Sequence, residues 1–239
     1  IGLGDGHGSR QAGGAAAAGH AILVRARMDT LSAAQLDELL HLLDDQWHVL
    51  VRTDNLLGPR HALSGVRDQI GVIEALLRSV RLPLRLQVLQ LGAKYAESAA
   101  WLHEDSGDLA GSRYWTGRSM EWALEAGDRR MMSWVLYRRG EHAAAGGDAA
   151  SAAGLAAAAR REGGDLPDPM LAAIFQQEAH AHALDGAEAA CLAALDRACE
   201  RAASGDPGDA SGGHGSFCTA AYVEMQRGRC CHAGPRSRA

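Results

Sequence analysis

The chain has 239 residues, with 24 lysine and arginine residues against 29 aspartate and glutamate residues, and therefore a formal net charge of -5 at pH 7. This balance argues against a concentrated basic face of the kind that holds a nucleic-acid backbone. Hydrophobic residues make up 47% of the chain and aromatic residues only 5%. Because most of the apolar residues are alanine and leucine, which favour helices, the composition predicts an all-α protein.

The chain starts with a segment that we expect to be disordered, residues 1–27, which are rich in glycine and alanine and lack helical periodicity. A helical hairpin is predicted over residues 28–82. Its first helix should begin at Ser32, because Ser32 and Gln35 have the spacing of a capping box. Pro59 fits the first turn of the second helix, where its missing N–H costs nothing.

Three further helical pairs are predicted over residues 83–203, because a glycine turn recurs there about every 40 residues, a spacing typical of helical repeats. The turn glycines are Gly107, Gly147 and Gly186. Small residues recur at fixed offsets from these turns: Ala100, Gly140 and Ala179 before them, and Ser112, Ala152, Cys191, Ser119, Ala159 and Ala198 after them. Paired helices approach closely where side chains are small. We therefore expect stacked antiparallel helical hairpins, a tetratricopeptide-like right-handed solenoid without a sheet.

The C-terminal part is expected to be irregular. Residues 204–216 are rich in glycine, aspartate and serine and predict a loop. Residues 217–239 predict a lone helix, from near Phe217 to near Cys231, and a tail that reads like a shifted reading frame. With Ile1 as the first residue, the chain is expected to be a fragment, a processed chain or an incomplete reading frame. A lone helix without a partner arm would leave apolar surface exposed, which predicts self-association.

The cysteines and the hydropathy predict a cytoplasmic protein. Five cysteines, an odd number, without a secretory signal indicate reduced thiols. No run of 18 or more apolar residues exists, so no membrane span is expected.

Most of the aromatic residues fall in one stretch of the chain. They are Tyr95, Trp101, Tyr114, Trp115, Trp122, Trp134 and Tyr137. Large rings can fill gaps between alanine-lined helices, and they can also line a groove for a peptide or an apolar small molecule, since tryptophan and tyrosine dominate binding hot spots. Both interpretations remain open, and these residues are the candidate binding site.

No motif predicts catalysis, a metal or a cofactor. His180 and His182 are two residues apart on a predicted helix, so their side chains point in nearly opposite directions and cannot easily share a metal. Cys191 and Cys199 are interpreted as buried thiols. No nucleophile elbow or phosphate loop follows a predicted strand, so we expect a protein that is not an enzyme.

Several stretches carry a resemblance to a known family. They are DNLLGPR at 54–60, YAESAAWL at 95–102, YWTGRSMEWA at 114–123, QQEAH at 176–180 and SFC at 216–218. Through them, residues 28–228 resemble the C-terminal helical region of actinobacterial helix-turn-helix (Xre-type) transcriptional regulators.

The resemblance implies a regulatory domain that senses a ligand or a partner, or that oligomerises, while a separate N-terminal domain binds DNA. That DNA-binding domain is not expected in this chain. The partners implied are a protein or peptide, or a small molecule, and a second copy of the chain. The alternative is a stand-alone helical-repeat scaffold for protein–protein interaction, and an enzyme is a distant third.

Overall fold

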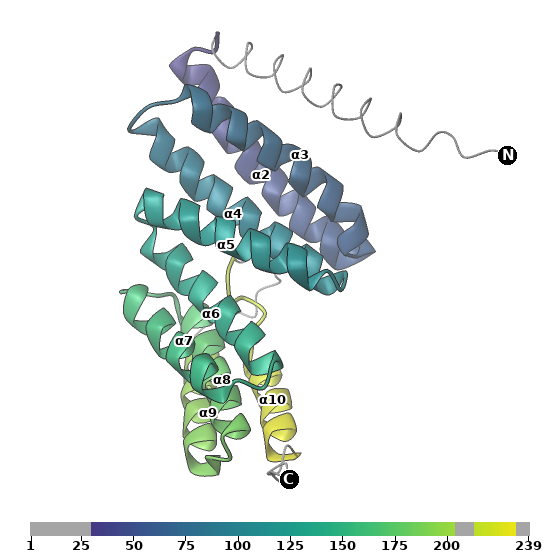
Figure 1. The fold of residues 1–239 in the computed structure, drawn as a ribbon, viewed down its shortest axis with the longest axis vertical. Coiled ribbons are helices and arrows are strands. Elements are labelled where there is room, and N and C mark those ends of the chain that lie inside the picture. Colours follow the sequence, from purple (N-terminus) through teal and green to yellow (C-terminus); the bar gives the residue numbers. More distant parts are fainter. Residues whose placement is uncertain (1–29, 204–212, 233–239) are drawn as a thin grey trace, which may run out of the picture.

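The computed structural model describes residues 30–203 and 213–232, and this part of the chain is all-α, without a strand (Figure 1). The prediction of an all-α fold is therefore confirmed. The helices are α2 (Ala33–Leu57), α3 (Pro59–Ser79), α4 (Leu84–Asp105), α5 (Leu109–Ala126), α6 (Arg129–Ala145), α7 (Ala149–Glu162), α8 (Asp168–Leu184), α9 (Glu188–Ala203) and α10 (Ala220–His232). Predictions for residues 1–29, 204–212 and 233–239 lie outside the described residues.

The first hairpin consists of α2 and α3. Ser32 caps α2 with the reciprocal pair of hydrogen bonds expected of a capping box, in which the Ser32 side chain accepts from the Gln35 backbone and the Gln35 side chain accepts from the Ser32 backbone. A single residue, Gly58, separates the two helices, and its φ of 86° is one that glycine adopts readily. Pro59 follows as the first residue of α3.

Glycine–aspartate turns join α4 to α5, α5 to α6 and α6 to α7, and a turn at Asp185-Gly186 joins α8 to α9. Gly107, Gly127, Gly147 and Gly186 all have a positive φ, between 67° and 82°. After the first three of these glycines, the side chains of Asp108, Asp128 and Asp148 accept the backbone N–H three residues on and cap the next helix. The turn at Gly127, which connects two hairpins, was not recognised in the sequence, although it repeats the turn found inside them.

The hairpins pack against one another in chain order, and Figure 1 shows them stacked along the long axis of the molecule. The small residues at the predicted packing positions are buried: Ala100, Ser112, Ser119, Gly140, Ala152, Ala159, Ala179, Cys191 and Ala198. Two of these serines bond to neighbouring helices. Ser119 Oγ donates to the Ala93 carbonyl within the α4–α5 pair, and Ser112 Oγ lies 3.4 Å from His142 Nε2 on α6, in the next hairpin. Small side chains thus bring the helices close in the register that the sequence predicted.

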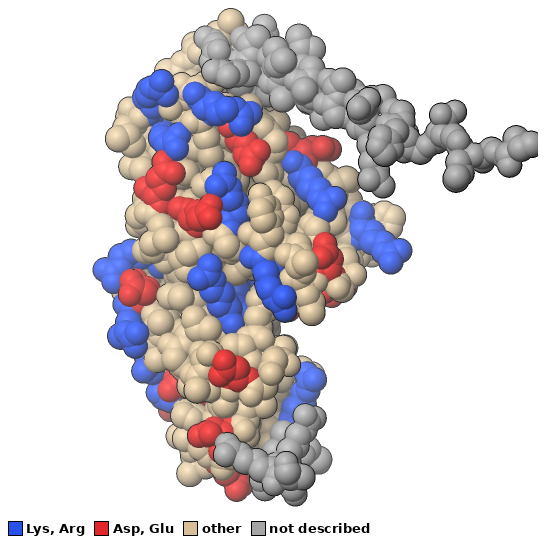
Figure 2. Space-filling view, viewed as in Figure 1, with Lys and Arg blue, Asp and Glu red and all other residues tan. Residues whose placement is uncertain are grey.

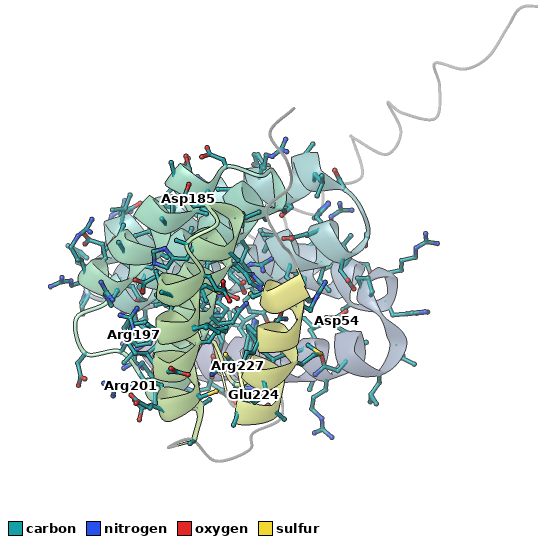
Figure 3. The ribbon with its side chains drawn as sticks, turned by 90° about the horizontal axis from the view of Figure 1, so that it is seen from below. Asp54, Asp185, Arg197, Arg201, Glu224 and Arg227 are labelled. Atoms are coloured by element: carbon teal, nitrogen blue, oxygen red, sulfur yellow. The ribbon has the colours of Figure 1, made fainter. Side chains whose placement is uncertain are left out.

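The C-terminal helix is shorter than predicted and is not isolated. It begins at Ala220 rather than near Phe217, and it packs on α9 and α8, with Val223 and Cys218 buried. Figure 3 shows α10 beside α9, with Arg227 on α10 facing that helix. Arg227 Nη2 lies 2.8 Å from Asp196 Oδ1. This contact fixes α10 against the last hairpin.

None of the helices in the described residues is long and apolar enough to cross a membrane.

Candidate functional site

A cavity of about 390 Å³ lies between the first helices of three successive hairpins and the segment that precedes α10. Its walls come from α2, α4 and α6, with one residue of α3, residues 213–217 and Tyr222 of α10. We call the surface formed by α2, α4 and α6 the inner face. Elements that are distant in sequence therefore line one partly enclosed space.

Three tryptophans from three helices form the apolar walls of the cavity: Trp47 on α2, Trp101 on α4 and Trp134 on α6. Each indole N–H donates to a polar side chain that also lines the cavity. Trp47 donates to Ser98 Oγ at 2.8 Å, Trp101 to Asp54 Oδ2 at 3.2 Å and Trp134 to Glu97 Oε1 at 3.0 Å. These bonds fix the orientation of the rings; Trp47 and Trp134 are buried, whereas Trp101 is 44% exposed.

The charged groups of the cavity centre on Arg138, which is buried on α6. Its guanidinium lies 2.5 Å from Glu141 Oε2, 2.6 Å from Glu104 Oε2 and 3.7 Å from Glu97 Oε1. Glu104 also accepts from His142 Nε2 at 2.8 Å when that nitrogen carries a proton. One guanidinium is therefore shared among three carboxylates from α4 and α6, and the cluster is acidic.

The pKa values of the carboxyl groups of the cavity shift in different directions, although burial raises all of them. For Glu97, burial raises the pKa, but contact with the imidazole of His214 and the charge of Arg138 outweigh it, so the pKa lies below its usual value. Burial raises the pKa of Glu141 above its usual value, although Arg138 and Tyr137 partly offset this. Burial also raises the pKa of Asp54, against the opposing hydrogen bond from Trp101. Asp54 and Glu141 are thus carboxylates whose charge is incompletely compensated.

The segment that closes the cavity, residues 213–219, lies against the inner face. His214 packs on Trp134, with ring centroids 5.0 Å apart, and its Nε2 lies 3.6 Å from Glu97 Oε2. This Nε2 is buried and has no hydrogen-bond partner. Gly215 approaches the first turn of α8 so closely that a Cβ would lie 2.6 Å from the Pro169 carbonyl carbon. Glycine is therefore required for this path of the chain.

A second, more open groove of about 770 Å³ lies on the other side of the same segment. Gly213 and His214 line both spaces, so the segment separates the groove from the cavity. The groove is more polar, with Asp44, Lys94 and Arg130 among its lining residues.

No family model, curated protein or solved structure matches this chain. The resemblance to helix-turn-helix regulators therefore stays a prediction, and the function has to be argued from the cavity itself.

Of the seven aromatic residues predicted to form a groove, two line the cavity, Trp101 and Trp134. Tyr95 and Trp122 are core residues, and the Tyr95 hydroxyl donates to the Leu43 carbonyl at 2.7 Å. Tyr137 is buried behind Trp134, where the two rings stack at 4.6 Å.

The remaining two predicted groove residues, Tyr114 and Trp115, also lie outside the cavity wall. They contact each other edge to face on α5, and Tyr114 is 63% exposed. The reason is that α5 is the second arm of its hairpin, whereas the hairpins line the cavity mainly with their first arms, α2, α4 and α6.

The polar half of the site was not predicted from the sequence, and neither were two aromatic residues, one before α10 and one on it. The polar residues are Glu97, Arg138, Glu141 and His214, and the aromatic residues are Phe217 and Tyr222, with Trp47 from the first hairpin. A signal was present for Glu97, because a glutamate in an alanine-rich stretch of a packed helix is buried and has to be paired. No local pattern indicates that His214 reaches α4.

Within the described residues, no group of three or more histidine, cysteine, aspartate or glutamate side chains is placed to hold a metal ion. His180 instead lies between α8 and α10, where its ring nitrogens contact Gln176 and Gln226. Burial lowers the pKa of His180.

Proposed function

We propose that this chain is the sensing domain of a bacterial transcriptional regulator, a cytoplasmic helical-repeat domain that binds a ligand or partner on its inner face while another domain binds DNA. The observation that carries the proposal is the cavity, whose walls come from three successive hairpins and from the segment before α10. A bound ligand contacts all of these elements at once. Binding therefore biases how the hairpins sit relative to one another, which a sensor requires.

The polar groups of the cavity favour binding over catalysis. The hydroxyl of Ser98 accepts from Trp47 Nε1 and donates to the Lys94 carbonyl, so it is held by structural bonds. Arg138 is held by Glu97, Glu104 and Glu141. Side chains held in this way orient a ligand without supplying a nucleophile and its base.

A ligand screen with a cavity-filling variant tests the proposal. Val51 lines the cavity and is half-buried, so Val51→Trp would occupy part of the space. We expect some members of a library of small organic metabolites to raise the melting temperature of the wild-type chain and not that of the variant. The proposal fails if every hit stabilises both proteins equally, since the ligands would then bind elsewhere.

The second candidate function is a stand-alone scaffold for protein partners. The open groove on the far side of His214 favours it, because a groove of about 770 Å³ suits an extended segment of another protein. Sequencing the DNA upstream of the codon for Ile1 discriminates the two candidates. An in-frame helix-turn-helix supports the regulator, and a different upstream frame supports the scaffold.

A further inference from the structure

The charge of the cavity is unbalanced. Three carboxylates line it, Asp54, Glu97 and Glu141, against one guanidinium, that of Arg138, and the imidazole of His214, which faces Glu97. Arg138 also pairs with Glu104, which lies behind the wall, so its charge is divided further. In an apolar, partly enclosed space, such an excess of negative charge is costly unless a cation compensates it.

The aromatic residues of the cavity already contact cations of the chain itself. Lys94 Nζ lies 3.8 Å from the ring centroid of Trp47, and the guanidinium carbon of Arg138 lies 4.9 Å from that of Trp101. Tryptophan is the best aromatic partner for a cation because of the negative potential over its ring face. The walls therefore suit a molecule that carries positive charge on an apolar body.

One polar atom in the cavity wall has no hydrogen-bond partner, and it lies beside Glu97. Glu97 is only 9% exposed, and its Oε2 has the His214 imidazole 3.6 Å away, beyond hydrogen-bonding distance. His214 Nε2 is itself buried without a hydrogen-bond partner. Buried polar atoms are nearly always bonded, so the unbonded His214 Nε2 indicates a missing hydrogen-bonding group at this point of the cavity wall.

We propose that the cavity binds a small organic cation, an amine or guanidinium attached to an aromatic or aliphatic body, with its charged group at Glu97 and its apolar body against Trp101 and Trp134. This inference rests on the proposed ligand-sensing function and specifies the class of ligand. The N–H groups of the cation donate to Glu97 and, in the tautomer that leaves Nε2 without a proton, to the unbonded nitrogen of His214. Asp54 and Glu141 place further negative charge around the bound cation.

The raised pKa values of Asp54 and Glu141 agree with this assignment. Burial is the largest cause of both shifts, and nearby positive charge does not cancel it. A bound cation would lower both pKa values, since an opposite charge favours the ionised carboxyl.

The test compares three probes of the same shape by isothermal titration calorimetry on the full chain. The probes are 4-phenylbutylamine, which is a cation, the neutral 4-phenylbutanol and the anionic 4-phenylbutyrate. We expect the amine to bind about tenfold or more tighter than the alcohol, because removing one partner of a buried charge pair costs at least that much. The anion should bind more weakly than both.

Two variants assign the effect to the site. Glu97→Gln should weaken the amine about tenfold while changing the affinity of the alcohol by less than about threefold, since the lost interaction is with charge. Glu121→Gln, a matched change at an exposed pair with Arg118 on α5, should leave both affinities unchanged. Asp54→Asn, which removes a carboxylate at the edge of the cavity, serves if Glu97→Gln does not fold, and it should weaken the amine selectively.

The results of these titrations distinguish a failure of the cation preference from a failure of the proposed ligand-sensing function. If the alcohol binds as tightly as the amine and Val51→Trp abolishes both, the cavity is a ligand site and the cation preference is wrong. If no probe binds, the inference is wrong, and the metabolite screen alone decides the proposed function. Nα-acetyl-lysine amide, which keeps the charged side-chain amine, is a further probe. Tighter binding of it than of 4-phenylbutylamine would overturn the assignment to a small molecule in favour of a peptide side chain.

Discussion

Glu97 shows how one residue joins the packing of the fold to the chemistry of the cavity. Its neighbours on α4 are core residues, yet its carboxylate accepts from Trp134 on α6 and faces His214 before α10. Arg138 lies 3.7 Å away. A buried charge of this kind is tolerated only because these partners surround it. The same contacts hold α4, α6 and the C-terminal segment in one arrangement.

The lowered pKa of Glu97 predicts an acid-sensitive contribution to stability. A carboxyl whose folded pKa lies below its unfolded value stabilises the fold above the unfolded pKa, and this contribution is lost as the pH falls through the folded value. Glu97→Gln should therefore reduce the free energy of unfolding at pH 7 by about 1–3 kcal/mol, because a charged hydrogen-bond acceptor is removed. Urea unfolding at several pH values measures the difference between the variant and the wild type.

That difference should shrink as the pH falls below the usual range of a glutamate, where the wild-type carboxylate also becomes neutral. Glu121→Gln, whose carboxyl is 65% exposed, is the control and should change stability little at any pH. A constant difference between Glu97→Gln and the wild type down to acid pH would show that the charge of Glu97 contributes nothing to folding.

At the scale of the helices, the close contact between α6 and its neighbours depends on Gly140. A Cβ at this position would lie 3.5 Å from Gln177 Cγ, 3.6 Å from the Ala152 carbonyl and 3.6 Å from Leu155 Cβ. These are ordinary contact distances, so alanine fits and a longer side chain does not.

Gly140→Leu and Ala179→Leu should each destabilise the fold by about 1–3 kcal/mol through overpacking. Gly140→Ala should be tolerated. Gly71→Ala is the matched control, because a Cβ there meets no atom within 4 Å, and removing a glycine from a helix interior should stabilise it by up to about 1 kcal/mol. The midpoint of urea denaturation, measured for each variant and for the wild type, gives the change in stability. If both leucine variants unfold at the wild-type midpoint, the helices do not approach closely at these positions.

Helix ends that are set by neighbouring residues could be predicted from the sequence, whereas those set by distant contacts could not. The start of α2 and the turns at Gly107, Gly147 and Gly186 follow from capping residues and positive-φ glycines, which are local, and their positions agreed closely with the sequence analysis. The start of α10 was predicted three residues early. Residues 213–219 lie against the inner face, and their path depends on Gly215 fitting beside Pro169, far away in the sequence.

The candidate site was predictable only in part, for the same reason. Aromatic content identified Trp101 and Trp134, but it could not separate them from Tyr95 and Trp122, which face the core. Which arm of a hairpin faces inward is decided by the packing of whole helices. The carboxylates and His214 meet only because α4, α6 and the C-terminal segment converge.

For the molecule as a whole, the distribution of charge predicts no specific binding of duplex DNA. Lys and Arg side chains are interspersed with Asp and Glu on the face seen in Figure 2, in keeping with the net charge of -5. A gel-shift titration of this chain at physiological salt should show only weak, non-specific association. Sequence-dependent binding that resists salt would contradict this prediction and would place DNA recognition within the chain.

The exposed apolar side chains predict association of the whole molecule with increasing concentration. Leu42, Val49 and Leu56 are spaced seven residues apart on α2 and are all exposed, and Met225 on α10 is 53% exposed. Patches of this kind favour self-association. Sedimentation velocity over about a hundredfold range of concentration should show oligomers, because mass action links association to concentration.

Variants locate the surface responsible. Val49→Glu combined with Leu56→Glu tests the stripe on α2, and Met225→Glu tests the C-terminal helix; the one that restores a monomer identifies the contact. A monomer at every concentration of the wild-type chain would contradict the prediction and would show that neither surface drives association.

The glycine–aspartate turns also constrain how the length of this chain can change. Gly107, Gly127 and Gly147 are separated by about 20 residues, one helix and one turn, and the same turn serves within hairpins and between them. Deleting residues 108–127 would join Gly107 to Asp128 and leave an intact turn, but every later helix would run in the opposite direction. Deleting residues 108–147 would join Gly107 to Asp148 with the same local sequence and keep each later helix running its original way. Gains and losses should therefore be tolerated in steps of two helices, as in other stacked repeats.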